Sequence, residues 1–205
     1  KKEEREAEKQ ILAMLTDLVR RFCPALEAIY EFLVNLDVIL AKAAFAETHE
    51  GHKAVFSPDE PLRLKQARHP LLAVAGKPVV PQDIELMAGQ QGFIVSGGNA
   101  GGKTVCLKTL GLLALMGLSG LPVTAAPGSV LPPLDKIFVL LGDEQSIEDH
   151  VSTFTAQITH LSGFWPELNH ATLVVLDEFG AGTDPAQGAA LAQAVVDGLL
   201  EHGAY

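Results

Sequence analysis

Phe93 to Thr109 reads FIVSGGNAGGKTVCLKT, and this stretch decides the expected fold. Its apolar start, Phe93–Val95, predicts a strand that runs directly into a glycine-dense turn. The turn, residues 97–104, reads GGNAGGKT and fits the phosphate-loop pattern G-x-x-x-x-G-K-[ST]. Glycines lack a Cβ atom, so successive backbone N–H groups can surround a phosphate oxygen. We therefore expect a strand, a phosphate-binding loop and a buried helix over Val105–Leu118.

The residues of this loop have separate expected roles. Lys103 supplies the charge that neutralises terminal phosphates, and the Thr104 hydroxyl is a ligand for Mg²⁺. A helix that begins near Lys103 points the positive end of its dipole at the same anion. A glycine-rich strand–helix turn without any ligand is the plain alternative, because short motifs recur by chance. The expected phosphate-binding residues are Gly97, Gly98, Asn99, Ala100, Gly101, Gly102, Lys103 and Thr104.

A second motif, TLVVLDE, occupies residues 172–178. Its apolar part is typical of a central parallel strand, and such strands place ligands at their carboxyl ends. Asp177 is there a candidate for holding Mg²⁺, usually through water, and Glu178 is the candidate catalytic carboxylate that polarises the attacking water. Two solvated acids at the end of a strand are the alternative. The phosphate-loop motif upstream favours the catalytic interpretation.

Composition limits the class of protein. The chain has 205 residues, 48% of them hydrophobic, and a formal net charge of −10. A surface this acidic argues against direct nucleic-acid binding by the segment as a whole. Cys23 and Cys106 suggest no disulfide framework, which fits a reduced, cytoplasmic protein. The charged start KKEEREAEKQ lacks the apolar region of a signal peptide, and Val105–Leu118 is too short to span a bilayer, so we expect no membrane partner.

The first part of the chain is expected to be helical. Apolar residues recur at helical spacing over Lys1–Glu47, with a break or kink near Pro24. Asn35 or Asp37 is expected to cap a further helix that ends near Ala46.

The segment Thr48–Gly92 is rich in proline and carries short alternating runs, which predict an antiparallel set of short strands and turns. We interpret His69 as a solvent-facing loop histidine, although a contact with a nucleotide base is the alternative.

Three further elements are expected after the buried helix. Lys136–Leu141 predicts another apolar strand, and Ser152-Thr153 precede a helical run from Phe154 to about Phe164. On the residues alone, either hydroxyl is an ordinary helix cap. Ala186–Glu201 predicts a helix with Pro185 at its start and Gly203 as its stop. The chain ends at Tyr205, where an alternating α/β pattern calls for another strand.

Taken together, GGNAGGKT, GDEQSIEDHVSTF and LVVLDEFGAGTDPAQGAALA resemble the ATPase domain of MutS proteins. GDEQSI, the following STF and GAGTDP are most similar to the MutS-two branch, whose members carry an Smr nuclease domain. The resemblance implies a fragment with an ABC-type P-loop NTPase fold: three α/β layers, a mostly parallel sheet and antiparallel strands ahead of the loop. Residues 1–48 would be a helical segment from the end of the lever and core helices. Residues 49–205 would be the ATPase domain, truncated before its last strand.

The same resemblance implies an ATPase that uses ATP and Mg²⁺ and forms a head-to-tail homodimer with composite sites. Lys103 and Glu178 would be catalytic, while Ser152 and Thr153 would act in trans on the partner's nucleotide. Asp184 matches the loop that crosses the dimer interface. ATP hydrolysis would gate a DNA-processing or ribosome-rescue assembly that holds branched DNA or the ribosome through domains absent here.

Some residues depart from the family pattern, and two other functions stay open. Gly98 stands where the family usually has proline, Cys106 replaces a threonine, and Gln187 replaces an acid. One alternative is a nucleotide-binding dimerisation switch with negligible hydrolysis. The other is a transporter-type ABC ATPase subunit, which would need an LSGGQ-like signature; Leu161-Ser162-Gly163 begins like one but lacks the Gly-Gln.

Overall fold

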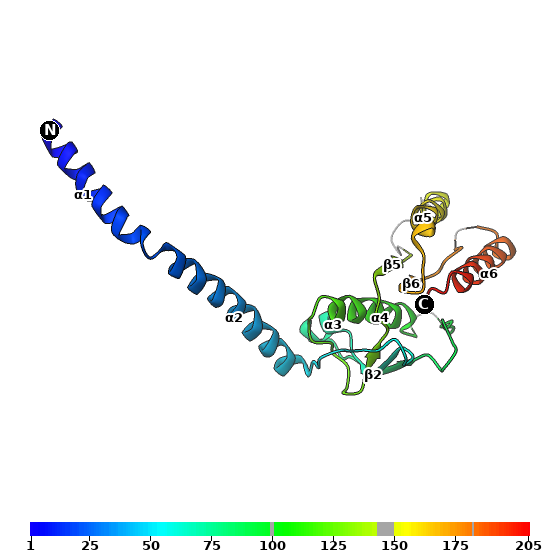
Figure 1. The fold of residues 1–205 in the computed structure, drawn as a ribbon. Helices are drawn as coiled ribbons and strands as arrows, with labels where there is room; N and C mark the ends of the chain where they lie inside the picture. Colours follow the sequence, from blue (N-terminus) through cyan, green and yellow to red (C-terminus); the bar gives the residue numbers. More distant parts are fainter. Residues whose placement is uncertain (99–100, 143–149, 182) are drawn as a thin grey trace. The chain divides into compact units, whose positions relative to one another are not determined.

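The structure is a computed structural model that describes residues 1–98, 101–142, 150–181 and 183–205, with the backbone alone for residues 150–154. It divides into a helical unit, Lys1–Ala44, and a larger mixed α/β unit, Phe45–Tyr205 (Figure 1).

The helical unit contains α1 (Lys2–Arg20) and most of α2 (Cys23–His49). The interruption between them comes just before Pro24, which lies in the first turn of α2, where a missing N–H removes no helical hydrogen bond. The expected new helix after Asn35 or Asp37 is wrong, because α2 continues through both residues. Asn and Asp cost only about 0.7 kcal/mol in a helix interior, and Leu33, Leu36 and Leu40 are good helix formers around them.

A regular apolar stripe follows both helices of this unit. The spacing between successive residues of the stripe alternates between four and three positions, and this alternation continues across the break between the two helices. They are Ile11, Leu15, Leu18, Phe22, Ala25, Ile29, Phe32, Leu36, Ile39 and Ala43. All ten are exposed, and α1 and α2, which the structure describes throughout, bury no residue. Such a stripe is typical of a helix that packs against other helices in a bundle.

The α/β unit begins with a four-stranded sheet in the order β1-β4-β2-β3. Its strands are β1 (Val55–Phe56), β2 (Arg63–Ala67), β3 (Gln82–Glu85) and β4 (Val130–Leu131), and the short helix α3 (Pro70–Val74) lies between β2 and β3 in the chain. β2 runs antiparallel to both β3 and β4. The antiparallel strands predicted ahead of the phosphate loop are therefore present.

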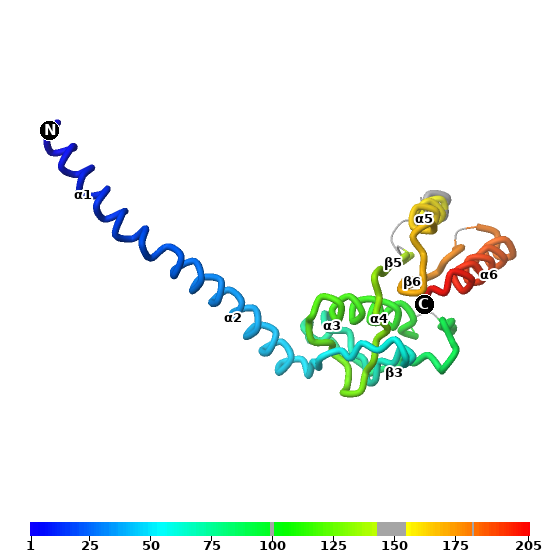
Figure 2. Tube along the Cα trace, in the orientation of Figure 1, coloured from blue at the N-terminus to red at the C-terminus, as the bar shows by residue number. Residues whose placement is uncertain are grey.

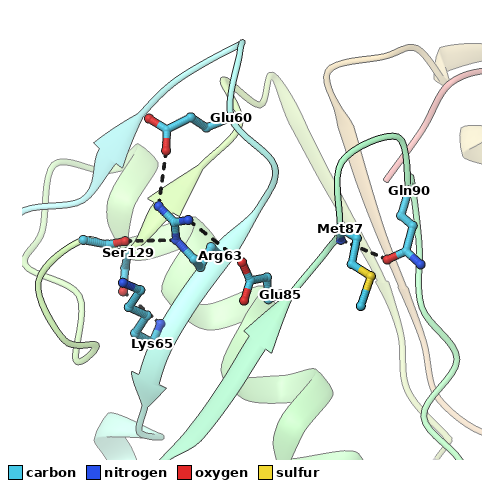
Figure 3. Close-up of polar contacts among 8 residues, drawn as sticks. Glu60, Arg63, Lys65, Glu85, Met87, Gln90 and Ser129 are labelled. Carbon is cyan, nitrogen blue, oxygen red and sulfur yellow. Dashed lines mark hydrogen bonds and ion pairs between the residues drawn. The ribbon is translucent and has the colours of Figure 1, made fainter.

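Arg63 ties the strands of this sheet together (Figure 3). Its Nε donates to the Gly128 carbonyl oxygen at 3.3 Å, and its Nη2 donates to a Glu60 carboxylate oxygen at 3.2 Å. A Glu85 oxygen on β3 lies 3.9 Å from Nη1. The guanidinium thus joins β2 and β3 to the turn that precedes β4.

The second sheet is the parallel pair of β5 (Lys136–Leu140) and β6 (Thr172–Leu176). Tyr205 adds to it, because its N–H donates to Thr172 O and its carbonyl accepts from Val174 N–H, both at 2.8 Å. Successive N–H groups of a strand point to opposite sides. Asp177 N–H donates to Leu140 O on β5, so Tyr205 lies on the other edge of β6. Tyr205 therefore pairs with β6 on the edge opposite β5.

Helices cover both faces of this parallel pair (Figure 2). Leu173 and Val175 of β6 share a core with α4 (Lys103–Leu118), while Val174 and Leu176 pack with α5 (His150–Phe164) and α6 (Pro185–Glu201). This alternation is the period of two that strand geometry imposes. A short 3₁₀ helix, η1 (Trp165–Glu167), follows α5.

The strand predicted at Phe93–Val95 is absent. These residues pair with neither sheet, and Ile94 is 83% exposed. A strand is stable only when its backbone groups pair with neighbours and its side chains pack, and the described part of the chain supplies no neighbour for this segment. In the part of the chain that the structure describes, parallel pairing is limited to β5 with β6, Tyr205 with β6 and the short contact of β1 with β4, rather than the mostly parallel sheet that was expected.

Candidate functional site

The loop ahead of α4 has the backbone conformation that its glycines permit. Gly97 has φ +148° and Gly102 has φ +84°, values that residues with a side chain rarely adopt. Gly101 N–H donates to Gly98 O at 3.2 Å, and Cys106 N–H donates to Gly102 O at 2.8 Å in the first turn of the helix. The loop therefore folds back on itself and ends at a helix N-terminus, where free backbone N–H groups favour an anion.

Lys103, the first residue of α4, closes this loop. Its Nζ donates to Gly97 O at 2.8 Å and to Gly98 O at 3.0 Å. An ammonium group has three donors, and these two bonds fix its position beside the loop backbone. The structure thus gathers Gly97, Gly98, Gly101, Gly102 and Lys103 into one cluster, with Thr104 next to them on the first turn of α4. Asn99 and Ala100, also predicted to bind phosphate, lie outside the described residues.

Asp177 and Glu178 directly follow β6, at the carboxyl edge of the parallel pair. Asp177 is 6% exposed, whereas Glu178 is exposed and has φ +50°. Gly142, after the neighbouring strand β5, lies beside Glu178: a Cβ atom on Gly142 would be in van der Waals contact with it, at 3.6 Å from Glu178 Cβ and 3.7 Å from Glu178 Oε2. The two acids thus differ in burial: the Asp177 side chain is buried and the Glu178 side chain is exposed.

Helix α4, which follows the loop, packs on the parallel strands that precede these acids. Gly111, in the middle of α4, packs on the parallel pair, because a Cβ atom there would lie 3.7 Å from Val139 and 3.8 Å from Val175. Leu113 of α4 is fully buried in the same core as Val175. The phosphate-loop helix therefore rests on the sheet whose edge carries Asp177.

A tight turn follows Glu178. Ala181 N–H donates to Glu178 O at 3.1 Å, and Gly180 has φ +83°. Gly180 N–H donates to the side-chain oxygen of Gln157, a residue of α5 that is only 6% exposed. Gln157 was not among the predicted site residues. The signal that could have identified it is its position: Gln157 lies four residues before Leu161 and seven before Phe164, so it is a polar residue on the same apolar helix face.

The predicted trans-acting pair lies differently from expectation. Ser152 and Thr153 are inside the first turn of α5, which begins at His150, rather than ahead of a helix that begins at Phe154. They therefore do not stand just outside a helix as its cap residues. Their side chains, and residues 143–149 before them, lie outside the described residues.

Asp184 is the N-cap of α6. Its Oδ1 accepts from Ala186 N–H and Gln187 N–H, both at 3.1 Å, and Pro185 begins the helix as predicted. A carboxylate in this position satisfies free N–H groups and interacts favourably with the helix dipole. Gly182, two residues before Asp184, is not described.

His69 differs from the solvent-facing loop histidine that was predicted. It is the N-terminal flanking residue of α3, and its Nδ1 is buried without a hydrogen-bond partner within the described structure. Burial, and then the positive charge of Lys108, lowers the pKa of His69 below its usual value. Burial likewise raises the pKa of the Cys106 thiol on α4, so this cysteine beside the loop favours the neutral form.

Comparisons with known proteins agree with the motif pattern. Residues 93–204 match the family described as MutS domain V. A relative named Endonuclease MutS2 from Solidesulfovibrio magneticus is 61% identical over 100% of this chain and 27% of its own length. Relatives of the same name from Maridesulfovibrio salexigens and Aquifex aeolicus are 56% and 40% identical, over 99% and 100% of this chain and 26% of each relative. The chain thus spans about a quarter of the length of these relatives.

Among the described helices, none combines the length and the apolar character needed to cross a membrane.

Proposed function

Since the chain belongs to the MutS family, we propose that residues 49–205 are an ABC-type ATPase domain that binds ATP with Mg²⁺ and hydrolyses it. We propose the three-layer P-loop NTPase fold for this domain, with residues 1–48 as a helical segment. The observation that carries the proposal is the closed loop at the start of α4, in which Lys103 Nζ lies on the carbonyls of Gly97 and Gly98.

The donor chemistry fits the proposed ligands. Positive φ angles at Gly97 and Gly102 and the N-terminus of α4 form a backbone cradle suited to phosphate. Mg²⁺ prefers oxygen ligands and is usually held by one or two protein oxygens together with phosphate and water. The Thr104 hydroxyl and the Asp177 carboxylate are such ligands. Among the described residues, no group of three or more His, Cys, Asp or Glu side chains forms a metal site of its own.

Each residue then has a role in hydrolysis. The backbone of residues 97–102 and the Lys103 ammonium bind and orient the phosphates, so the terminal phosphorus is presented to solvent in one geometry. Glu178, exposed at the strand edge, orients a water molecule and accepts its proton. Mg²⁺, when bound, neutralises charge that develops on the phosphate oxygens.

We further propose that the domain works as a cytoplasmic homodimer with composite sites. Ser152 and Thr153, near the N-terminus of α5, would bind the γ-phosphate held by the other subunit, since a helix N-terminus attracts anions. The names of the relatives indicate action on nucleic acid. ATP turnover would therefore gate a DNA-processing or ribosome-rescue assembly that holds branched DNA or the ribosome. Neither the family nor the motifs support a transporter-type subunit.

One specific residue favours a second candidate function. Gly98 has nothing within 4 Å of the place where a Cβ atom would lie, so the loop has more freedom than one with proline there. Ordering such a loop around a nucleotide costs more conformational entropy. This cost favours a nucleotide-binding dimerisation switch with negligible hydrolysis as the second candidate.

Glu178→Gln tests the proposal and separates it from the switch. The amide is nearly isosteric but does not accept a proton from water, so Mg-ATP affinity should stay and turnover should fall about 10²-fold or more. Phosphate release and binding of a fluorescent ATP analogue measure the two effects. Glu201→Gln, an exposed acid at the end of α6, is the matched control and should change neither. A fall of less than about tenfold would contradict the general-base role. Tight binding without turnover in the unmodified protein would favour the switch.

A further inference from the structure

Gln157 is a buried polar residue on an otherwise apolar face of α5. It is 6% exposed, and the residues one and two turns further along, Leu161 and Phe164, are 7% and 8% exposed. A side-chain amide in such a place costs free energy unless it is hydrogen-bonded. Its Oε1 accepts from the backbone N–H of Gly180 at 3.3 Å. The amide therefore connects α5 to a segment 23 residues away in the sequence.

Gly180 belongs to the turn that carries Glu178. Ala181 N–H donates to Glu178 O, which closes the turn, and Gly180 sits in the left-handed region at φ +83°. On its other side the turn lies against α6, since a Cβ atom on Gly180 would be 2.9 Å from Gly188 O. The turn is thus held between α6, through backbone contact, and α5, through Gln157.

Glu178 itself depends on these surroundings. A residue with a side chain at φ +50° is strained, and such a conformation persists only when neighbouring contacts enforce it. The bonds that enforce it lie within the next three residues: the Ala181 bond closes the turn and the Gln157 bond anchors it. Loss of the anchor would let the turn, and with it the Glu178 carboxylate, take other orientations.

We infer that Gln157 is a positioning residue for Glu178: by accepting the Gly180 N–H, it fixes the orientation of the carboxylate that activates water. The inference rests on the proposed hydrolysis of ATP. It also gives α5 a second role, because Thr153 lies one helical turn before Gln157. A helix whose first turn is proposed to bind the partner's nucleotide is thereby joined to the catalytic carboxylate of its own subunit.

Two substitutions at Gln157 separate the hydrogen bond from the packing. Gln157→Met keeps the length of the side chain but removes the acceptor. Gln157→Glu keeps an acceptor oxygen in either protonation state. Leu161→Val, one turn along the same buried face, is the stability control, because it removes core volume without touching the turn. All three are compared with the unmodified protein by melting temperature, Mg-ATP affinity, turnover number, and hydrogen exchange of the Gly180 amide.

We expect Gln157→Met to exchange the Gly180 amide faster and to lose turnover roughly tenfold to a hundredfold, since a misplacement of about 1 Å can cost about 10²-fold. Its Mg-ATP affinity should be unchanged, because the phosphate loop is untouched. Gln157→Glu should keep most of the turnover, and Leu161→Val should lower the melting temperature without a comparable loss of turnover.

Other results would overturn the inference. If the unmodified protein hydrolyses ATP and Gln157→Met is equally active, or if Gly180 exchange is the same in both, the positioning role is wrong and the proposed function stands. Equal losses in Gln157→Glu and Gln157→Met would likewise reject the hydrogen bond as the cause. An unmodified protein that binds Mg-ATP without turnover would refute the proposed function, and the positioning role with it.

Discussion

Gly188 of α6 lies so close to Gly180 that a Cβ atom at position 188 would be 2.6 Å from the Gly180 carbonyl oxygen. The reverse approach is nearly as close, with 2.9 Å from a Cβ atom at position 180 to Gly188 O. Real Cβ contacts are essentially never shorter than 3.0 Å. The turn after the candidate catalytic carboxylate and the first turns of α6 can therefore touch only because neither position carries a side chain.

Gly188→Ala should separate these two backbones. Overpacking costs about 1–3 kcal/mol, against a gain of about 1 kcal/mol from the better helix propensity of alanine. Gly163→Ala on α5 is the matched control, since its Cβ atom would meet nothing within 4 Å and only the propensity gain applies. Urea unfolding should place Gly188→Ala below Gly163→Ala by at least about 1 kcal/mol in the free energy of unfolding. Equal stabilities would show that the turn can move away at little cost.

Lys103 should be indispensable for nucleotide binding. Lys103→Ala removes the cation from the phosphate cradle and also the two bonds that close the loop on Gly97 O and Gly98 O. Titration with a fluorescent ATP analogue should show affinity reduced beyond the measurable range. Lys108→Ala, an exposed lysine on the same helix, should bind ATP normally. Unchanged affinity in Lys103→Ala would reject the phosphate-loop assignment.

A mixing experiment tests whether Ser152 acts in trans, in a dimer-forming form of the protein. Homodimers of Lys103→Ala should be inactive, and those of Ser152→Ala should be impaired. A heterodimer of the two contains one site that combines the intact loop of one chain with the intact Ser152 of the other. Mixing should therefore restore part of the ATPase activity.

If Ser152 served its own chain's nucleotide, each site in the mixed dimer would keep one defect. Tagged pull-down must first show that subunits exchange. Exchange without any recovery of activity would reject the composite site and leave Ser152 as an ordinary residue of the first turn of α5.

His69 should make the stability of the protein depend on pH. The pKa of His69 in the folded state lies below its usual value, through burial first and the charge of Lys108 second, so the unfolded chain binds a proton more readily. The neutral form therefore contributes its full stability above about pH 6.5, and this contribution is lost as pH falls towards the folded-state pKa.

Thermal unfolding between pH 5 and 8 should show this loss, and His69→Gln should show a smaller one. His160→Gln, at an exposed position on α5, is the control. In an NMR titration, Lys108→Ala should raise the pKa of His69 only part of the way, because burial is the larger cause. A His69 pKa at or above 6.5 in the unmodified protein would contradict the prediction.

Local patterns were sufficient for much of this fold. The apolar runs of β5 and β6 and the helix over Val105–Leu118 were predicted correctly because their signals lie within short windows of sequence. The start of α5 was predicted at Phe154 instead of His150, since helix ends are set by backbone bonds that composition reflects weakly. Phe93–Val95 had the right composition for a strand but lacks the pairing that a strand requires.

The candidate site divides in the same way. Lys103, Asp177 and Glu178 belong to contiguous motifs, so the sequence alone was sufficient to propose them. Gln157 carries only a local signal, its helical spacing with the buried Leu161 and Phe164, and its contact with Gly180, 23 positions away, does not show in the sequence. The proximity of Gly180 and Gly188 is also a tertiary feature, since nothing in the spacing of two glycines shows that their backbones touch.

The left-handed conformation of Glu178 has a consequence for how the protein responds to selection. A residue with a side chain in this region loses about 1–2 kcal/mol, and asparagine tolerates it better than glutamate does. Glu178→Asn should therefore raise the melting temperature slightly while abolishing ATP turnover, because its shorter amide neither reaches the water nor accepts its proton. In a library sorted for thermal stability alone, position 178 should drift away from glutamate. In one sorted for growth that depends on the protein, glutamate should persist. No bias at position 178 in either library would show that neither the backbone strain nor the carboxylate chemistry constrains this position.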